Sequence, residues 1–86
     1  MLFKVYAISS IERNYIYVGL TSNLENRIER HNKGYEKTTK PYRPFQLIHS
    51  ETHPDRVAAR KHEKYLKSPS GKDFLRNIHT GLSTDR

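Results

Sequence analysis

The chain has 86 residues, a net charge of +7 and no cysteine. This length predicts one small domain, which buries only about 60% of its unfolded surface and leaves no room for a second domain. The lack of cysteine excludes disulfides and thiolate zinc sites, while the positive charge favours a polyanionic partner. No apolar run approaches the ~20 residues that span a bilayer, and the N-terminus lacks a signal-peptide pattern. We therefore expect a cytoplasmic protein without membrane contact.

The first two predicted elements are strands. Residues 2–8 and 15–19 are rich in apolar, aromatic and β-branched residues, which is typical of buried strands. The polar segment of about five residues between them predicts an antiparallel hairpin, whose second strand ends at Gly19.

A helix is predicted next, over the residues that follow this hairpin. Ser22 and Glu25 have the spacing of a capping box. The helix is expected to run to about Lys33, with Gly34 as its C-terminal stop. The remaining predicted elements are a polar loop at 35–44, a strand at 45–50, a helix from a Thr52 cap to about Lys67, a helix at 72–78 and a frayed tail at 79–86. The order β-β-α-β-α-α indicates a small α/β (α+β) sheet covered by helices.

The first helix carries two polar side chains on its apolar side. Arg27 and His31 are four residues apart and therefore share a helix face, which also holds Leu24 and Ile28. Protein cores rarely contain a guanidinium or an imidazole without a reason. We therefore interpret Arg27 and His31 as parts of a functional site.

Glu63 lies at the edge of the apolar face of the second predicted helix. Taken alone, a surface ion pair with Lys67, four residues later, explains this position better. Because Arg27 and His31 also lie at the core side of a helix, we expect the three side chains to form one cluster with tyrosines of the two strands.

Other familiar chemistries find no support in the sequence. The histidines His49, His53, His62 and His79 do not stand in a metal-binding spacing with a partner. A glycine-rich phosphate loop and a serine in a nucleophile-elbow frame are also lacking. Acyl transfer and nucleotide hydrolysis are therefore not predicted.

The pattern resembles the GIY-YIG nuclease domain. The resemblance is carried by Val5-Tyr6-Ala7, Tyr17-Val18-Gly19, Arg27, His31 and Glu63. It covers residues 1–78 and is closest to small stand-alone, excinuclease-like bacterial members. It implies a three-stranded antiparallel sheet flanked by helices, and metal-dependent hydrolysis of nucleic-acid phosphodiester bonds, for example in DNA repair.

The resemblance also implies a role for individual residues. Tyr6 and Tyr17 match the two motif tyrosines, which position or activate the attacking water, and Arg27 matches the arginine that steadies phosphate charge. His31 matches a candidate general base. Since a tyrosine with a pKa near ~10 is a poor base at neutral pH, we expect His31 to accept the proton, directly or through Tyr6.

Three further positions follow from the resemblance. Glu63 matches the carboxylate that binds a single divalent metal, expected to be Mg²⁺ or Mn²⁺ because oxygen ligands suit these ions. Asn77 matches a late asparagine of the family. Leu20 stands where many relatives carry a lysine that helps to bind phosphate.

Substrate binding is expected from basic residues around this cluster. The predicted nucleic-acid contacts are Lys33, Lys37, Lys40, Arg43, Lys61 and Lys64, and Tyr42 is a candidate stacking platform for an unpaired base. Nothing resembles a base-reading module, so we expect an endonuclease that recognises DNA by backbone and shape. The alternatives are a non-catalytic nucleic-acid-binding protein and a module that docks on an acidic protein. A protein partner for targeting is compatible with each.

Overall fold

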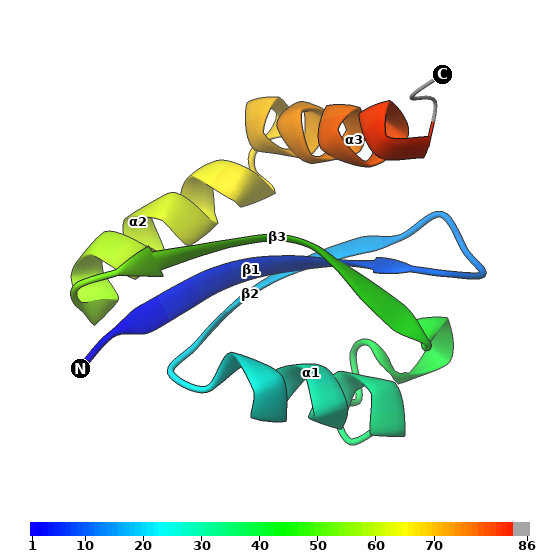
Figure 1. The fold of residues 1–86 in the computed structure, drawn as a ribbon, viewed down its shortest axis with the longest axis horizontal. Helices are drawn as coiled ribbons and strands as arrows, with labels where there is room; N and C mark the ends of the chain where they lie inside the picture. The colour runs from blue at the N-terminus through cyan, green and yellow to red at the C-terminus, as the bar shows by residue number, and fades with distance from the viewer. Residues whose placement is uncertain (84–86) are drawn as a thin grey trace.

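The structure, a computed structural model, describes residues 1–83, and side chains as far as residue 78. Its elements are β1 (Phe3–Ser10), β2 (Ile16–Thr21), α1 (Leu24–Lys33), a 3₁₀ turn η1 (Lys40–Tyr42), β3 (Phe45–His53), α2 (Arg56–Lys67) and α3 (Pro69–Ser83) (Figure 1). The predicted order β-β-α-β-α-α is confirmed. No helix within this part of the chain is both long and apolar enough to cross a bilayer.

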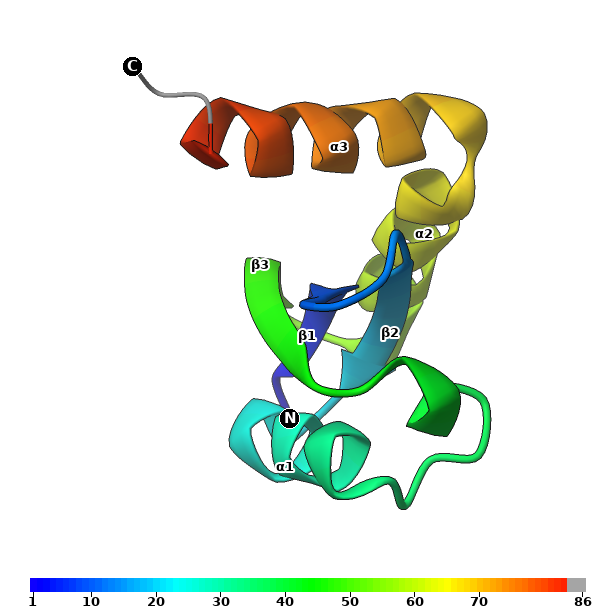
Figure 2. The same cartoon turned by 90° about the vertical axis from the view of Figure 1, so that its right-hand side faces the viewer.

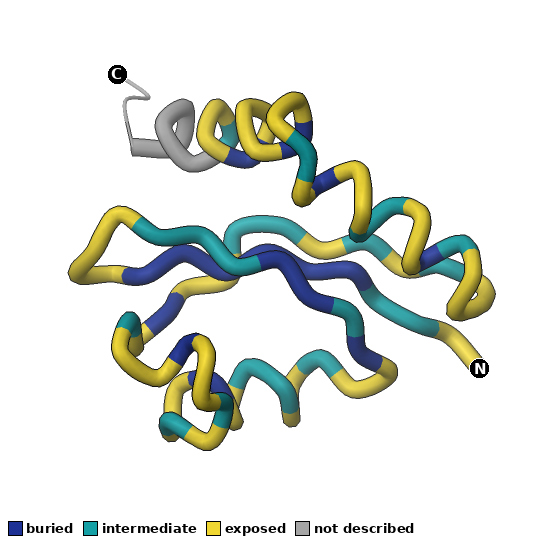
Figure 3. Tube along the Cα trace, turned by 180° about the vertical axis from the view of Figure 1, so that it is seen from behind, coloured by how far each residue is buried: buried dark blue, intermediate teal, exposed yellow. Residues whose placement is uncertain are grey.

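The three strands form one antiparallel sheet with the order β2-β1-β3, so that β1 lies in the middle. Helix α1 covers one face, and α2 and α3 lie on the other face (Figures 1 and 2). The predicted three-stranded antiparallel sheet with flanking helices is therefore confirmed. The central strand carries the longest buried segment of the trace (Figure 3).

Side chains of β1 alternate between two hydrophobic clusters, because successive residues of a strand point to opposite faces. Val5 and Ala7 belong to the cluster beneath α2 and α3, together with Leu66 and Leu75. Tyr6 and its neighbours on the same face belong to the cluster beside α1. The sheet thus divides the protein into two separate packing layers, and each layer holds one group of polar side chains.

All three strands extend further than the sequence predicted. β1 continues to Ser10, which pairs with Phe45. β2 continues through Gly19 to Thr21, because the ladder with β1 continues to the pair Lys4↔Thr21. β3 continues to His53, which pairs with Phe3. Backbone pairing needs no apolar side chains, so the polar composition after residue 50 hid the second half of β3.

The helix caps also differ from the predicted ones by a few residues. Asn23, and not Ser22, caps α1: its side chain accepts a hydrogen bond of 3.1 Å from the Asn26 backbone N–H. Asp55, and not Thr52, caps α2 through the Ala58 N–H at 2.8 Å.

The stop of α1 is as predicted, and α3 is longer than expected. Gly34 adopts a left-handed conformation with φ of 82°, which glycine tolerates without steric cost. Helix α3 begins at Pro69, earlier than the predicted 72, because proline is well suited to a first helical turn. It runs to Ser83, and the end of the predicted tail, residues 84–86, lies outside the described residues.

Candidate active site

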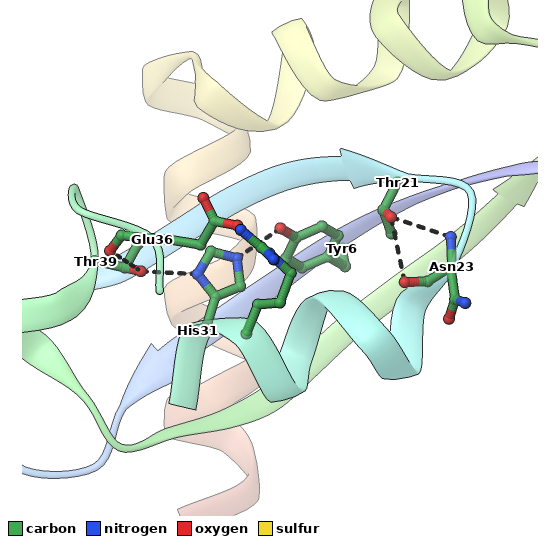
Figure 4. Close-up of polar contacts among 7 residues, drawn as sticks. Tyr6, Thr21, Asn23, His31, Glu36 and Thr39 are labelled. Atoms are coloured by element: carbon green, nitrogen blue, oxygen red, sulfur yellow. Dashed lines mark hydrogen bonds and ion pairs between the residues drawn. The ribbon is translucent and has the colours of Figure 1, made fainter. Parts of the chain in front are cut away.

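A chain of three hydrogen-bonded side chains lies between β1 and α1. The Tyr6 hydroxyl is 2.8 Å from His31 Nε2, and His31 Nδ1 is 2.8 Å from Thr39 Oγ1. Figure 4 shows the Tyr6 phenol and the His31 ring pointing toward one another, with Thr39 on the far side of the ring. All three residues are buried, with His31 only 1% exposed.

We assign the protons of this chain to the His31 tautomer that satisfies every contact. In it, the Thr39 hydroxyl donates to the Glu36 backbone carbonyl at 3.4 Å, and the Thr39 oxygen accepts from His31 Nδ1–H. His31 Nε2 is then unprotonated and accepts from the Tyr6 hydroxyl. His31 is therefore oriented as an acceptor toward Tyr6.

The surroundings keep both side chains uncharged at neutral pH. Burial raises the pKa of the Tyr6 phenol above its ordinary value; Tyr17 adds to this effect and the nearby Arg27 charge opposes it. Burial also lowers the pKa of His31; Glu36 opposes that shift, and Arg27 adds to it. A neutral imidazole beside a neutral phenol is the state in which the imidazole can accept a proton.

The two motif tyrosines lie together with His31. The ring centroids of Tyr6 and Tyr17 are 6.4 Å apart, and those of Tyr17 and His31 are 5.1 Å apart. Tyr6 is fully buried, whereas Tyr17, on the edge strand β2, is partly exposed. Of the two phenols, Tyr17 is therefore the one that solvent or a substrate can reach.

Gly19 makes room for the Tyr6 ring. It pairs with Tyr6 in the β1–β2 ladder, and a Cβ at this position would lie 2.8 Å from Tyr6 Cε1 and closer still to the phenol oxygen. Any side chain there would force the Tyr6 ring to move. This close approach explains why a glycine occupies this position of the strand.

Arg27 lies on the same side of α1 as His31 and is partly buried. Its positive charge influences the pKa of Tyr6, His31 and Glu36. Glu36 forms a salt bridge of 2.8 Å with Arg30, so the carboxylate nearest to this group already has a partner. The structure thus brings together four of the predicted catalytic residues: Tyr6, Tyr17, Arg27 and His31.

Glu63 is not part of this group. It lies on α2, which covers the other face of the sheet (Figure 1), and it forms an ion pair of 3.1 Å with Lys67. Lys67 in turn lines, together with Tyr17 and Lys72, a depression along the edge strand β2. Glu63 therefore approaches the tyrosines only around the edge of the sheet, through Lys67.

The other predicted residues lie at the surface. Asn77 is exposed on α3. The exposed predicted cations are divided between the two faces of the sheet: Lys33, Lys37, Lys40 and Arg43 lie on α1 and the segment after it, and Lys61 and Lys64 lie on α2. One face of the Tyr42 ring is stacked on Tyr15, with centroids 3.9 Å apart, and is closed to a base; the Arg13 guanidinium also lies over the ring, 6.0 Å from its centroid.

Sequence reasoning missed Thr39, which orients His31. It stands in the polar loop eight residues after His31 and has no pattern that distinguishes it from Thr38. The spacing of the other histidines also gave no sign of a partner, but the fold places His49 and His62 against Glu51. The signal that could have revealed this cluster is the alternation His49, Glu51, His53 along a strand.

The comparison with protein families agrees with this arrangement. A family model described as the GIY-YIG catalytic domain matches residues 3–77. Among curated proteins, a UPF0213 protein of Natronomonas pharaonis is 34% identical over 67 residues, covering 77% of this chain and 78% of the relative. A UPF0213 protein of Syntrophus aciditrophicus is 33% identical and covers 86% of each chain. A Pediococcus pentosaceus UPF0213 protein is 58% identical over 40 residues, which span 45% of this chain and 42% of that protein.

A solved structure of a UPF0213 protein is similar to this chain in its fold. The solution NMR structure of a UPF0213 protein from Bacillus halodurans superposes with a TM-score of 0.53 at 28% sequence identity. The superposition covers 98% of this chain and 99% of the other.

Proposed function

Because the chain belongs to the GIY-YIG catalytic domain family, we propose that it is a divalent-metal-dependent endonuclease that hydrolyses phosphodiester bonds in DNA. The observation that carries this proposal is the buried contact between the Tyr6 hydroxyl and the unprotonated Nε2 of His31, at 2.8 Å. A buried phenol hydroxyl needs a hydrogen-bond partner in any case, but a backbone carbonyl would satisfy it, whereas an imidazole can also take up a proton. A reaction that removes a proton from water needs such an acceptor.

The exposed and the buried members of the group have different roles in the proposed reaction. The attacking water meets Tyr17 and Arg27, which are partly exposed. The water would give its proton to the Tyr17 phenol, which would pass its own proton to the Tyr6 hydroxyl, and Tyr6 would pass its proton to Nε2 of His31; Thr39 fixes the orientation of the imidazole. This arrangement removes the direct route for His31, because its Nε2 is engaged by Tyr6 and its ring is buried.

Arg27 supplies positive charge where negative charge develops. Its planar guanidinium matches the geometry of a phosphate group. No salt bridge neutralises Arg27 among the described residues, whereas Glu36 is held by Arg30 at 2.8 Å. In a partly dehydrated site, such a charge stabilises a phosphorane-like transition state more than the substrate.

Glu63 offers a single carboxylate to a divalent cation, in a depression that it shares with five cationic side chains: Arg56, Arg60, Lys61, Lys64 and Lys67. An ion there would therefore need the charge of substrate phosphates as well. No cluster of three carboxylate or imidazole groups includes Glu63 within the part of the chain that the structure describes. Mg²⁺ is commonly bound by one or two carboxylates together with water and substrate phosphates. Glu63 would hold such an ion after releasing Lys67, and the bound ion would supply Lewis-acid stabilisation of the phosphate.

The shape of the surface favours a substrate that follows the edge of β2. Tyr17, Lys67 and Lys72 line one depression there, and Lys72 and Arg76 line a second one beside Tyr15 and Ile16. Lysine side chains contact phosphates without reading bases. We therefore infer that recognition depends on DNA structure, as in flaps or branches. A cytoplasmic location stays a prediction.

One observation favours the alternative of a non-catalytic nucleic-acid-binding protein. The Glu63–Lys67 pair at 3.1 Å is what a purely structural role for Glu63 predicts. In that case the basic surface would bind DNA, and the Tyr6–His31 contact would only stabilise the fold.

A cleavage assay separates the two functions. Branched, flapped and single-stranded DNA, with matching RNA, should be incubated with the protein and Mg²⁺ or Mn²⁺. We expect cleavage of a structured DNA by the wild type and a strong loss with Tyr17→Phe. Tyr35→Phe is the matched control, because Tyr35 is 63% exposed and remote from the proposed chemistry. DNA binding without cleavage of any substrate would establish the binding protein instead.

A further inference from the structure

A second group of polar side chains lies on the other face of the sheet. His49 and Glu51 come from alternate positions of β3, and His62 comes from α2. His49 Nε2 is 2.7 Å from Glu51 Oε2, and His62 Nε2 is 2.6 Å from the same oxygen. The candidate ligand atoms of the three side chains all lie within 4.8 Å of one another.

A third histidine belongs to the same group. His53 follows Glu51 by two residues on β3 and therefore shares its face of the strand. Its Nε2 lies 3.6 Å from Glu51 Oε1, too far for a good hydrogen bond, and this buried atom has no hydrogen-bond partner. A buried polar atom without a partner is costly, and a cation between the side chains would remove this cost.

We propose that His49, Glu51 and His62 bind a Zn²⁺ ion, with His53 as the fourth ligand. Imidazole nitrogen with one carboxylate suits Zn²⁺ and similar transition metals, whereas Mg²⁺ and Ca²⁺ prefer oxygen ligands alone. Zn–N bonds of 2.0–2.1 Å place neighbouring ligand atoms of a tetrahedral site about 3.3 Å apart. The separations between the histidine Nε2 atoms and the Glu51 oxygens, 2.6–3.6 Å, bracket that value.

The group is accessible to ions, and a bound ion would have a structural role. The exposed fractions of the His49, Glu51 and His62 side chains are 17%, 33% and 27%, so water and ions reach the group. The bound ion would fasten α2 to β3. Small domains without disulfides gain stability from such a structural metal, and each ligating histidine would carry its remaining ring proton at Nδ1.

This group is separate from Tyr6 and His31, because α2 and α1 lie on opposite faces of the sheet (Figure 2). Glu63, the neighbour of His62 on α2, pairs with Lys67 at 3.1 Å, whereas His62 contacts Glu51. The test of the Zn²⁺ site therefore uses no cleavage. Metal-free protein, prepared with a chelator, is titrated with Zn²⁺ alone, and both the binding isotherm and the thermal unfolding temperature are measured. At Zn²⁺ concentrations about a hundredfold above Kd, we expect the unfolding temperature to rise by roughly 10 °C.

Two variants and one control locate the binding. Glu51→Gln and His62→Ala should each weaken Zn²⁺ affinity roughly tenfold or more, since even outer-shell partners of a metal ligand contribute 10–100-fold. His62→Ala covers the case in which Glu51→Gln does not fold, because alanine is well tolerated in a helix. Glu25→Gln, an exposed carboxylate on α1, should bind Zn²⁺ like the wild type.

Each outcome has a clear meaning. One equivalent of Zn²⁺, lost in the two variants and kept in the control, supports the site. Replacement by Co²⁺ should then give the intense visible absorption of a four-coordinate ion. The absence of any Zn²⁺-dependent shift, or equal binding by the wild type and His62→Ala, would overturn the proposal.

Discussion

Histidine has different partners on the two faces of the sheet. On the α1 face, His31 is 1% exposed and contacts two hydroxyl groups. On the other face, His49 and His62 contact one carboxylate oxygen of Glu51 and remain partly exposed. The two groups occur on opposite sides of the same strands, so their difference arises from the side chains that surround each imidazole.

The comparison shows how surroundings select the chemistry of one residue type. Burial among hydroxyl groups keeps His31 neutral and directs its lone pair at a phenol, which suits proton transfer. A negatively charged carboxylate beside several accessible imidazoles brings oxygen and nitrogen ligand atoms close together, which favours the binding of a cation. We therefore assign proton chemistry to the α1 face and metal binding to His49, Glu51 and His62.

The largest expected effect concerns Arg27. Arg27→Ala should lower the rate of DNA cleavage by roughly 100- to 1000-fold, because it removes a charge that stabilises the transition state. The unfolding free energy should change little, because a partly buried cation without a salt bridge among the described residues contributes little to folding. Single-turnover cleavage and chemical denaturation measure the two quantities. Arg60→Ala, an exposed change on α2, is the control; lower stability with unchanged cleavage would make Arg27 structural.

A smaller effect is expected at Gly19. Gly19→Ala places a methyl group against the Tyr6 ring, so the ring must shift and its contact with His31 must change. We expect a loss of about 1–3 kcal/mol in unfolding free energy, as for other overpacked sites, and slower cleavage. Zn²⁺ affinity should not change, because the metal group lies on the other face. Altered Zn²⁺ binding would show that the two faces are coupled.

The pH dependence of stability should reflect the environment of His31. Its pKa in the folded protein is lowered from 6.5, mainly by burial, so the unfolded chain binds the proton more tightly. This contribution to stability is complete above pH 6.5 and is lost as the pH falls through the folded pKa. Unfolding free energies measured at several pH values should therefore fall on the acidic side, and less steeply in His31→Gln. An equally steep fall in the variant would assign the effect to other groups.

The smallest expected effect is on DNA binding. Replacing Lys37 and Lys40 by glutamine should reduce the slope of log affinity against log salt by about 0.9 for each lost phosphate contact. Fluorescence anisotropy at several salt concentrations measures this slope. The same double change at Lys61 and Lys64 tests the other face. An unchanged slope for one pair would show that DNA lies on the face of the other pair.

The features that depend on local spacing could be predicted from the sequence alone. Arg27 and His31 were predicted to share a face from their four-residue helical spacing, and Tyr6 and Tyr17 were predicted to join them because their segments resemble the two GIY-YIG motifs. Gly34 was found because a left-handed cap favours glycine. These rules act over a few residues and need no knowledge of the tertiary structure.

The features that the sequence did not reveal depend on tertiary contacts. Thr39 contacts His31 only because the loop after α1 folds back on the helix. Glu51 was placed outside the third strand because its polar neighbours concealed the end of β3. His62 meets Glu51 only because α2 packs beside that strand. In each case, segments that are distant or irregular in sequence had to be placed in space first.

One NMR experiment observes both faces at once. Histidine side-chain ¹H–¹⁵N spectra are recorded during a Zn²⁺ titration and at several pH values. We expect His31 to be protonated at Nδ1 only, to have a pKa below 6.5, and to be unaffected by Zn²⁺. The Nε2 signals of His49 and His62 should shift with one equivalent of the ion. A doubly protonated His31 at pH 7, or Zn²⁺ shifts at His31 without shifts at His49 and His62, would contradict the division of roles between the two faces.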